Sequence, residues 1–379
     1  MNRLKELITE LCPNGVEYQE LNQISEMKRG TSITKKDIIE GTTPVISGGR
    51  EPAYYCDKYN RDGETITVAG SGAGAGYVQY WDRPIFVCDA FSIQGHEDVN
   101  TKYLYYCLSN KQEYIYSTKK GGGVPHVHIS SIENLKIPLP PLPVQQEIVR
   151  ILDSFTELTA ELTAELTARR KQYEYYRDEL LKFGNDVPIV KLGDIGKVSM
   201  CKRIMKAETS TAGDVPFYKI GTFGGIANAY ISQETFEKYK TTYSYPKKGD
   251  VLISAAGTIG RTVIFDGKPA YFQDSNIVWI DNDESLVLNK YLFYCYQLQP
   301  WQVSTGGTIA RLYNDNISKA KIPVPPLAEQ ARIVSILDRF DALCNDLTIG
   351  LPAEIEARQK QYEYYRDKLL NFKSLSRNS

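Results

Sequence analysis

The sequence is poor in the residues and motifs from which most metal and catalytic sites are built. It has only three histidines in 379 residues, and its seven cysteines include no Cys-x-x-Cys pair, which argues against a zinc site or a disulfide framework. It also has no Gly-x-x-x-x-Gly-Lys-Ser/Thr loop and no Asn/Asp-Pro-Pro-Tyr/Phe tetrapeptide. We therefore expect neither a P-loop ATPase nor an amino-methyltransferase, and no metal or cofactor bound to this chain.

Long apolar runs and a strong excess of charge are also missing. No run approaches the ~18 apolar residues of a membrane span, and the N-terminal MNRLKELITELC lacks the apolar segment of a signal peptide, so the cytoplasm is the predicted compartment. The formal charge is only −1, so a basic surface for nucleic acid would have to be local. Cys107 and Cys295 occupy matching places in TKYLYYC and NKYLFYC and are predicted to be buried thiols.

The most informative feature is an internal repeat. Residues 136–155 (KIPLPPLPVQQEIVRILDSF) match residues 321–340 (KIPVPPLAEQARIVSILDRF) at an offset of 185. Residues 171–181 (KQYEYYRDELL) match residues 360–370 (KQYEYYRDKLL) at an offset of 189, so the second helical stretch carries four extra residues. Weaker matches join the remaining parts in the same order. The chain is therefore one module written twice.

Each copy ends in a long amphipathic helix. Apolar residues recur every three or four positions through 144–183, a helical period. Forty helical residues span roughly 60 Å at ~1.5 Å each, and such a stripe needs a partner, so we predict an antiparallel coiled coil. Gly350 and Pro352 should break or kink the second helix. The predicted helix-pairing residues are Leu152, Phe155, Leu158, Leu162, Leu166, Leu337, Phe340, Leu343 and Leu347.

The globular parts contain short Val/Ile/Tyr/Phe runs between Gly, Asn and Asp turns, which indicates mixed structure with more strand than helix. A short helix is expected over 101–116 and over its counterpart 289–299. The predicted class is α+β: two homologous strand-rich domains separated by two long helices. The arrangement is circular with a pseudo-two-fold axis, because the N-terminal LKELITELCPNGVEYQEL echoes residues 176–192. The predicted boundaries are 1–140 and 185–325 for the domains, 141–184 and 326–373 for the helical spacers, and 374–379 for a tail.

A glycine-rich run at Gly70–Gly76 resembles a dinucleotide-binding or S-adenosylmethionine-binding loop. That interpretation requires a helix after the loop, whereas YVQYWDRPIFV is aromatic, β-branched and ended by proline, which favours a strand. We interpret the run and its counterpart SAAGTIGRT as turns where the backbone approaches a ligand such as a phosphate oxygen. His126 and His128 would lie on one side of a strand, and a hydrogen-bonding pair is favoured over a metal site.

Basic and polar residues recur beside these turns. Arg and Lys can bind guanine edges or phosphates, and Asn and Gln can read adenine, although a single basic loop residue is usually a solvated surface group. The DNA-binding candidates in the first copy are Lys28, Arg29, Lys35, Lys36, Arg50, Ser71, Gly72, Lys119, Lys120, His126 and His128, with Tyr77 and Gln79 nearby. Those in the second copy are Lys202, Arg203, Lys206, Lys219, Lys247, Lys248, Thr258, Arg261, Arg311, Tyr313 and Asn314, with Tyr218 and Asn228 nearby.

The repeated helical segments carry a family resemblance. The run KIPLPPLPVQQEIVRILDSF, followed by TELTAELTAELTARRKQYEYYRDELL, closely resembles the specificity subunits of type I restriction-modification systems, especially the IC-like subfamily. The resemblance implies two target recognition domains, each reading one half of an asymmetric bipartite site in double-stranded DNA, and two modification subunits docked on the helices. It also implies that S-adenosylmethionine-dependent adenine methylation and ATP-driven translocation and cleavage belong to partner subunits.

The Thr-Ala-Glu-Leu units between 156 and 167 are each about one helical turn. One unit adds ~6 Å to the helix, equivalent to about one or two base pairs at ~3.4 Å each. Their number is therefore predicted to set the spacing between the half-sites. The leading hypothesis is a non-catalytic subunit that reads DNA sequence. Two alternatives stay open: an assembly scaffold or inactive decoy without base readout, and an enzyme such as a methyltransferase or nuclease.

Overall fold

The computed structural model describes residues 2–33, 39–303, 310–346 and 348–375. Lys35, Lys36 and Leu347, three of the predicted site and helix-pairing residues, lie outside the described residues. The chain divides into two units: the first is Met1–Ala164 with Glu354–Ser379, and the second is Glu165–Ala353. Each unit contains one globular copy and part of the helical spacers.

The first globular copy is built on an antiparallel four-stranded sheet in the order β2-β8-β5-β6. Its inner strand β5 reads Thr-Ile-Thr-Val-Ala and is buried at every position, as expected for a β-branched strand covered on both faces. A three-stranded sheet, β4-β3-β7, contains one parallel pair, β3 with β7. The strands are β1 (Glu17–Glu20), β2 (Ser25–Arg29), β3 (Thr43–Ile46), β4 (Tyr54–Cys56), β5 (Thr65–Ala69), β6 (Val78–Trp81), β7 (Phe86–Val87), β8 (Ala90–Gly95) and β9 (Lys136–Leu139), with β1 paired to β9.

The second copy repeats this topology strand for strand. Its sheets have the orders β11-β17-β14-β15 and β13-β12-β16, again with one parallel pair, β12 with β16, and β10 pairs with β18. The predicted α+β class with two homologous domains is therefore confirmed. The strands are β10 (Ile189–Lys191), β11 (Lys197–Met200), β12 (Val215–Tyr218), β13 (Tyr230–Ile231), β14 (Val251–Ser254), β15 (Thr262–Ile264), β16 (Tyr271–Phe272), β17 (Ile277–Asp281) and β18 (Lys321–Pro323).

Short helices complete each copy. The helix predicted over 101–116 is in fact two helices, because Lys111 has φ −107° and ψ 20°, outside the helical region. Cys107 and Cys295, in the matching helices α3 and α8, are buried free thiols as predicted. The helices are α2 (Leu21–Ile24), α3 (Thr101–Ser109), α4 (Gln112–Ser117), α6 (Leu192–Ile195), α7 (Gln233–Thr242), α8 (Asn289–Gln297) and α9 (Asn314–Lys319), with 3-10 turns at Ile129–Ser131 and Lys206–Glu208.

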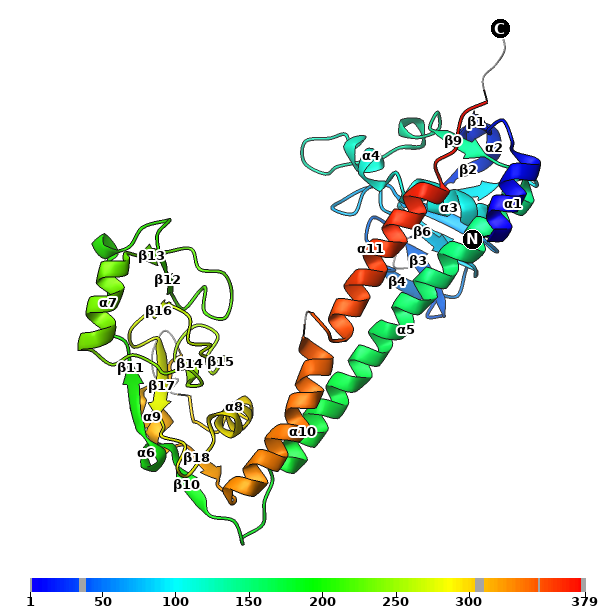
Figure 1. Cartoon of the computed structure of the whole chain (residues 1–379). Helices are drawn as coiled ribbons and strands as arrows, with labels where there is room; N and C mark the ends of the chain where they lie inside the picture. The colour runs from blue at the N-terminus through cyan, green and yellow to red at the C-terminus, as the bar shows by residue number, and fades with distance from the viewer. Residues whose placement is uncertain (1, 34–38, 304–309, 347, 376–379) are drawn as a thin grey trace. The chain divides into compact units, whose positions relative to one another are not determined.

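The spacer consists of α5 (Leu142–Leu180), α10 (Leu327–Asn345) and α11 (Leu351–Leu369). Helix α5 is unbroken for 39 residues, whereas the second spacer is interrupted before Gly350 and Pro352, as the sequence predicts (Figure 1). A Cβ atom on Gly350 would lie 2.5 Å from the carbonyl oxygen of Ala342, so a side chain does not fit there. Pro352 lies in the first turn of α11, where a missing N–H costs no helical hydrogen bond. Among the described residues, no helix combines the length and apolarity needed to cross a membrane.

Aromatic stacking joins the spacer helices within each unit. In the first unit, α5 and α11 run antiparallel and the Phe155 ring stacks on Tyr365 with centroids 5.5 Å apart (Figure 1). In the second unit, Tyr176 near the end of α5 stacks on Phe340 of α10 at 5.6 Å. Leu152 is fully buried in the core of the first unit.

One predicted pairing residue faces solvent instead of a helix. Leu343 is 38% exposed, and Cys344 is fully buried beside Leu337 in its place. At ~100° per residue, seven residues return to the same face of a helix, whereas six residues leave the side chain ~120° away. Leu158 and Leu162 are half-buried. Leu166 is partly buried and packs against the core of the second unit.

The N-terminal residues and the segment after α11 meet in the first unit. Helix α1 (Asn2–Leu11) precedes β1, and the amide of Val16 donates to the carbonyl of Lys373 at 2.8 Å. The Tyr18 hydroxyl donates to the carbonyl of Phe372 at 2.8 Å. Strand β1 thus follows α1 as β10 follows α5, which is the circular relationship that the sequence echo indicates.

Candidate nucleic-acid interface

The glycine-rich run of the first copy is a tight turn between β5 and β6. The amide of Gly76 donates to the carbonyl of Ala69 at 2.7 Å. Gly72 and Gly76 have φ values of 78° and 82°, which residues with a Cβ rarely adopt. The segment that follows is strand β6, as the sequence predicts, and not the helix that a dinucleotide loop requires.

Backbone hydrogen bonds join the glycine-rich turn to the segment around His126. The amide of Val127 donates to the carbonyl of Gly70 at 3.0 Å, and the amide of Gly72 donates to the carbonyl of Pro125 at 3.0 Å. Because Val127 is buried, the residues on either side of it project away from the core. Residues that are about fifty positions apart in the sequence therefore form one local surface.

Several predicted residues meet on that surface. The rings of His126 and His128 stack in parallel with centroids 6.0 Å apart, in an extended segment and not in the strand that the sequence suggests. Lys120 and His126 exchange two backbone hydrogen bonds of 2.9 and 2.8 Å. The Ser71 hydroxyl donates to the carboxylate of Asp89.

Other predicted cations of the first copy contact rings or acids. A cation over an aromatic face is attracted by the ring quadrupole, which holds the charge without neutralising it. Arg29 is exposed on β2. The contacts are Arg50 over Tyr77 (4.9 Å to the centroid), Lys119 over Tyr116 (4.2 Å) and Lys28 with Glu26 (2.7 Å).

The second copy forms the same turn from a different sequence. The amide of Gly260 donates to the carbonyl of Ser254 at 2.9 Å, and Gly257 and Gly260 have φ values of 65° and 77°. The amide of Leu312 donates to the carbonyl of Ala255 at 2.9 Å, as Val127 does in the first copy. The backbone frame is therefore shared by the two copies.

The shared frame carries different side chains in the two copies. At the repeat offset of 185, Arg311 matches His126, and Tyr313 matches His128. Arg311 donates to the carbonyl of Ser275 at 2.5 Å, and Tyr313 is 56% exposed. One scaffold thus presents an imidazole pair in one copy and a guanidinium with a phenol in the other.

A basic cavity of about 470 Å³ lies beside this position in the second copy. Four of the predicted residues line it: Arg203, Lys206, Lys219 and Arg311. The carboxylate in its lining is Asp274, which accepts a hydrogen bond from Nε of Arg203 at 2.8 Å. Four cations and one carboxylate leave a formal charge of +3 around the cavity (4 − 1), although the whole chain carries −1. The basic surface is therefore local.

Two amide side chains in the cavity wall are functional candidates that the sequence analysis missed. Gln273 and Asn276 line the cavity, and the amide of Ile220 donates to Oε1 of Gln273 at 2.9 Å. Amide side chains can read base edges. Asn276 occupies the place that Asp89 has in the first copy, because the amide of Ala255 donates to the carbonyl of Asn276 at 2.8 Å as the amide of Gly70 donates to the carbonyl of Asp89 at 3.0 Å.

The remaining candidates of the second copy lie outside the cavity lining. The guanidinium of Arg261 donates to the carbonyl of Phe223 at 2.8 Å, so part of its hydrogen-bonding capacity serves the fold. A hydrogen bond to Asp281 raises the pKa of Lys247. Lys202 lies 5.2 Å from the centroid of the Tyr243 ring. The other predicted residues of the second copy outside the cavity are exposed, except Tyr218, which is half-buried. The exposed ones are Lys248, Thr258, Asn314 and Asn228.

The cysteines and acidic residues do not gather into metal-binding groups in the described part of the chain. No group of three His, Cys, Asp or Glu side chains there is placed to hold a metal ion. Burial raises the pKa of the Cys107 and Cys295 thiols to about 12, which keeps them protonated and unreactive at neutral pH.

The chain contains two copies of one α+β domain, and each copy is joined to a helical spacer. Each copy presents different side chains from a common turn. This organisation is typical of a protein with two binding sites of different specificity. The family described as the type I restriction modification DNA specificity domain matches residues 13–169 and 185–357. This chain belongs to that family, and its role is DNA sequence specificity.

Curated relatives agree with the family, and a solved structure shares the fold. The chain is 48% identical over 371 residues to a putative type I restriction enzyme specificity subunit of Haemophilus influenzae, covering 94% of this chain and 96% of the relative. It is 37% identical over 297 residues to the EcoR124I/EcoR124II specificity subunit of Escherichia coli, covering 72% and 70%. The fold is similar to a crystal structure of the type I restriction-modification S subunit from M. genitalium, with a TM-score of 0.62, 18% identity and coverage of 94% and 96%.

Proposed function

We propose that each globular domain reads one half of an asymmetric bipartite DNA site and that the chain catalyses no reaction itself. Two modification subunits dock on the helical spacer and bring S-adenosylmethionine, and restriction subunits that use ATP join through the complex. The chain itself binds no cofactor or metal and works in the cytoplasm. The number of Thr-Ala-Glu-Leu units in α5 sets the spacing between the half-sites.

The observation that carries this proposal is the basic cavity. Phosphate contacts dominate affinity for DNA, and lysine and arginine supply them. Four lysine and arginine residues and only one carboxylate line the cavity, although the total formal charge of the chain is −1. Gln273 and Asn276 add amide groups of the kind that hydrogen-bond to base edges. A pure scaffold has no need for this combination.

The asymmetry of the proposed site follows from comparing the copies. The turn at Gly70–Gly76 and the turn at 254–261 share their backbone hydrogen bonds. The side chains beside them differ, since His126 in one copy corresponds to Arg311 in the other. In this proposal, similar frames with different side chains bind DNA in the same pose and read different bases.

Lys219→Ala in the complex with the modification subunits tests the cavity, and Lys238→Ala is the matched control. Both lysines are exposed and lie in the second unit, but only Lys219 lines the cavity. If Lys219 neutralises one phosphate, its loss reduces the slope of log K against log salt by about 0.9. If it reads a base, sequence preference changes at one position. Equal salt slopes and equal sequence preferences for the two variants would contradict the assignment.

A further inference from the structure

Both units contain the same polar contact between a helix of the globular domain and a helix of the spacer. In the first unit, Asp153 on α5 accepts a hydrogen bond from the Tyr106 hydroxyl at 2.5 Å and from Nζ of Lys102 at 2.9 Å. Both donors lie on α3, four residues apart, and therefore on one face of that helix. We call this three-residue contact the latch.

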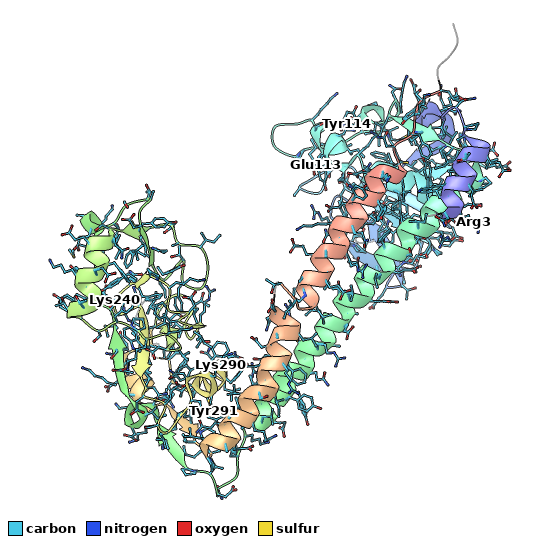
Figure 2. All side chains as sticks on the ribbon, in the orientation of Figure 1. Arg3, Glu113, Tyr114, Lys240, Lys290 and Tyr291 are labelled. Atoms are coloured by element: carbon cyan, nitrogen blue, oxygen red, sulfur yellow. The ribbon has the colours of Figure 1, made fainter. Side chains whose placement is uncertain are left out.

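The second unit repeats the latch with the same residue types. Asp338 on α10 accepts from the Tyr294 hydroxyl at 2.5 Å and from Nζ of Lys290 at 2.8 Å. Both donors lie on α8, and Figure 2 shows Lys290 there beside Tyr291. Each aspartate lies eleven residues after the first residue of its helix, from 142 to 153 and from 327 to 338.

A buried glutamine forms a second repeated contact near the start of each spacer helix. Gln145 and Gln330 are both fully buried. Nε2 of Gln145 donates to the carbonyls of Asp98 and Pro140 at 3.3 and 2.8 Å, and its Oε1 accepts from the amide of Asn100 at 2.9 Å. The equivalent bonds of Gln330 involve Leu286 (3.0 Å), Pro325 (2.8 Å) and Leu288 (2.9 Å).

These polar contacts contribute direction as well as stability. Apolar packing is non-directional, so helices joined only by apolar side chains can adopt several neighbouring angles. A charge-assisted hydrogen bond is short and strong and tolerates little change in geometry. The Asp153 and Asp338 side chains are 24% and 39% exposed, and ion pairs that solvent reaches contribute little to stability. Stability alone therefore does not account for the same polar set in both units.

We infer that the latches of Asp153 and Asp338 are positioning contacts that hold each recognition domain at one angle on its spacer helix. The glutamine contact holds the N-terminal turn of the spacer helix against the globular domain. The latch lies two turns further along the helix and prevents the domain from rotating about that first contact. Each domain then presents its half-site surface in one register, so the complex accepts one half-site spacing. This inference rests on the proposed function of the chain.

Two pairs of Tyr→Phe substitutions separate positioning from stability. The latch pair is Tyr106→Phe with Tyr294→Phe. The control pair is Tyr103→Phe with Tyr291→Phe, on the same helices, whose buried hydroxyls donate to the carbonyls of Pro138 and Pro323 at 2.9 and 3.1 Å. Each substitution removes one buried hydroxyl, but the control hydroxyls bond within the globular domain and not to the spacer helix.

The measurement is the methylation rate of the complete modification complex on DNA whose half-sites are one base pair closer, at the natural spacing, or one base pair further apart. The preference for the natural spacing is expected to fall about tenfold or more in the latch pair, because a hydrogen bond to a charged group is lost. The control pair should lower the thermal midpoint similarly and keep the preference. An unchanged preference in the latch pair, or an equal loss in both pairs, overturns the inference.

A second variant keeps the test decisive if the latch pair does not fold. Lys102→Met with Lys290→Met removes only partly exposed ammonium groups, whose side chains are 29% and 49% exposed, and should relax the spacing preference in the same direction. The unaltered complex separates failure of the proposed function from failure of the latch. If it shows no spacing preference, the proposed spacing function fails and the inference fails with it. If it shows the preference and both variants keep it, only the inference fails.

Discussion

Deleting one Thr-Ala-Glu-Leu unit, residues 159–162, should shift the spacing of the recognised half-sites without changing their sequences. The unit lies inside the unbroken helix α5. The Thr159 hydroxyl donates to the carbonyl of Phe155 at 2.9 Å, and the Thr163 hydroxyl donates to the carbonyl of Thr159 at 2.7 Å. These bonds to the preceding turn show regular helix across the unit. After the deletion, Leu158 and Leu166 are four residues apart, so the apolar column continues.

The size of the shift is set by helix geometry. Four residues shorten α5 by ~6 Å and rotate the helix beyond the deletion by ~400°, a net turn of about 40°. At ~3.4 Å per base pair the shortening corresponds to about two base pairs. At 10–10.5 base pairs per turn of DNA, the rotation corresponds to about one. We therefore expect the spacer to become one or two base pairs shorter.

Methylome sequencing of a host that expresses the complex measures this directly, because the proposed adenine methylation marks both half-sites. The control variant is Thr159→Ala with Thr163→Ala, which changes the composition of the unit and keeps its length. Its spacer should be unchanged. A spacer that keeps its natural length in the deletion variant, with both half-sites still methylated, would refute the spacing mechanism.

Two further predictions concern the core. Leu337→Ala should lower the free energy of unfolding by about 2–5 kcal/mol, whereas Leu343→Ala on the same helix should lower it by about 0.5 kcal/mol. The reason is that Leu337 is fully buried and Leu343 is 38% exposed. Urea unfolding of the two variants measures the difference, and equal losses would place Leu343 in the core. Cys107 and Cys295, whose pKa is raised by burial from 9.0 to about 12, should be alkylated about a thousandfold more slowly in the folded chain than in the unfolded chain at pH 8, as mass spectrometry would show. The thiols lose their protons at a lower pH in the unfolded chain than in the folded chain, so the stability that the two buried protonated thiols contribute should be lost as the pH rises from about 9 to 12. Rapid alkylation of the native chain, or a free energy of unfolding that stays constant over that range, would contradict the burial of these thiols.

The organisation of the chain was predictable because its signals are local and repeated. The helical period through 144–183, the break at Gly350 and Pro352, and the two copies of the glycine turn each lie within one short stretch of sequence. The steric and hydrogen-bonding preferences of a few neighbouring residues decide such features. Leu343 was wrongly predicted to face the partner helix, because spacings of three and of four residues both fit one apolar stripe. Only packing against the partner decides that Cys344 and not Leu343 is buried.

The interface was only partly predictable. The four cations of the cavity were among the sequence candidates, but so were Arg261, which bonds to the carbonyl of Phe223, and Lys247, which pairs with Asp281. A basic residue carries no local signal of whether its charge will be used by the fold or face a ligand. Gln273 and Asn276 were missed because their neighbours in the cavity come from distant parts of the chain.

The sequence by itself determined that this protein is one module written twice, with a spacer of set length, because helix and turn preferences act over a few residues. Only the tertiary structure decided which cations share a cavity and which amides join them, because residues around 203, 219, 275 and 311 meet through the pairing of strands. The structure alone also revealed the latch, since Tyr106 and Asp153 are 47 residues apart and become partners only when α3 packs on α5.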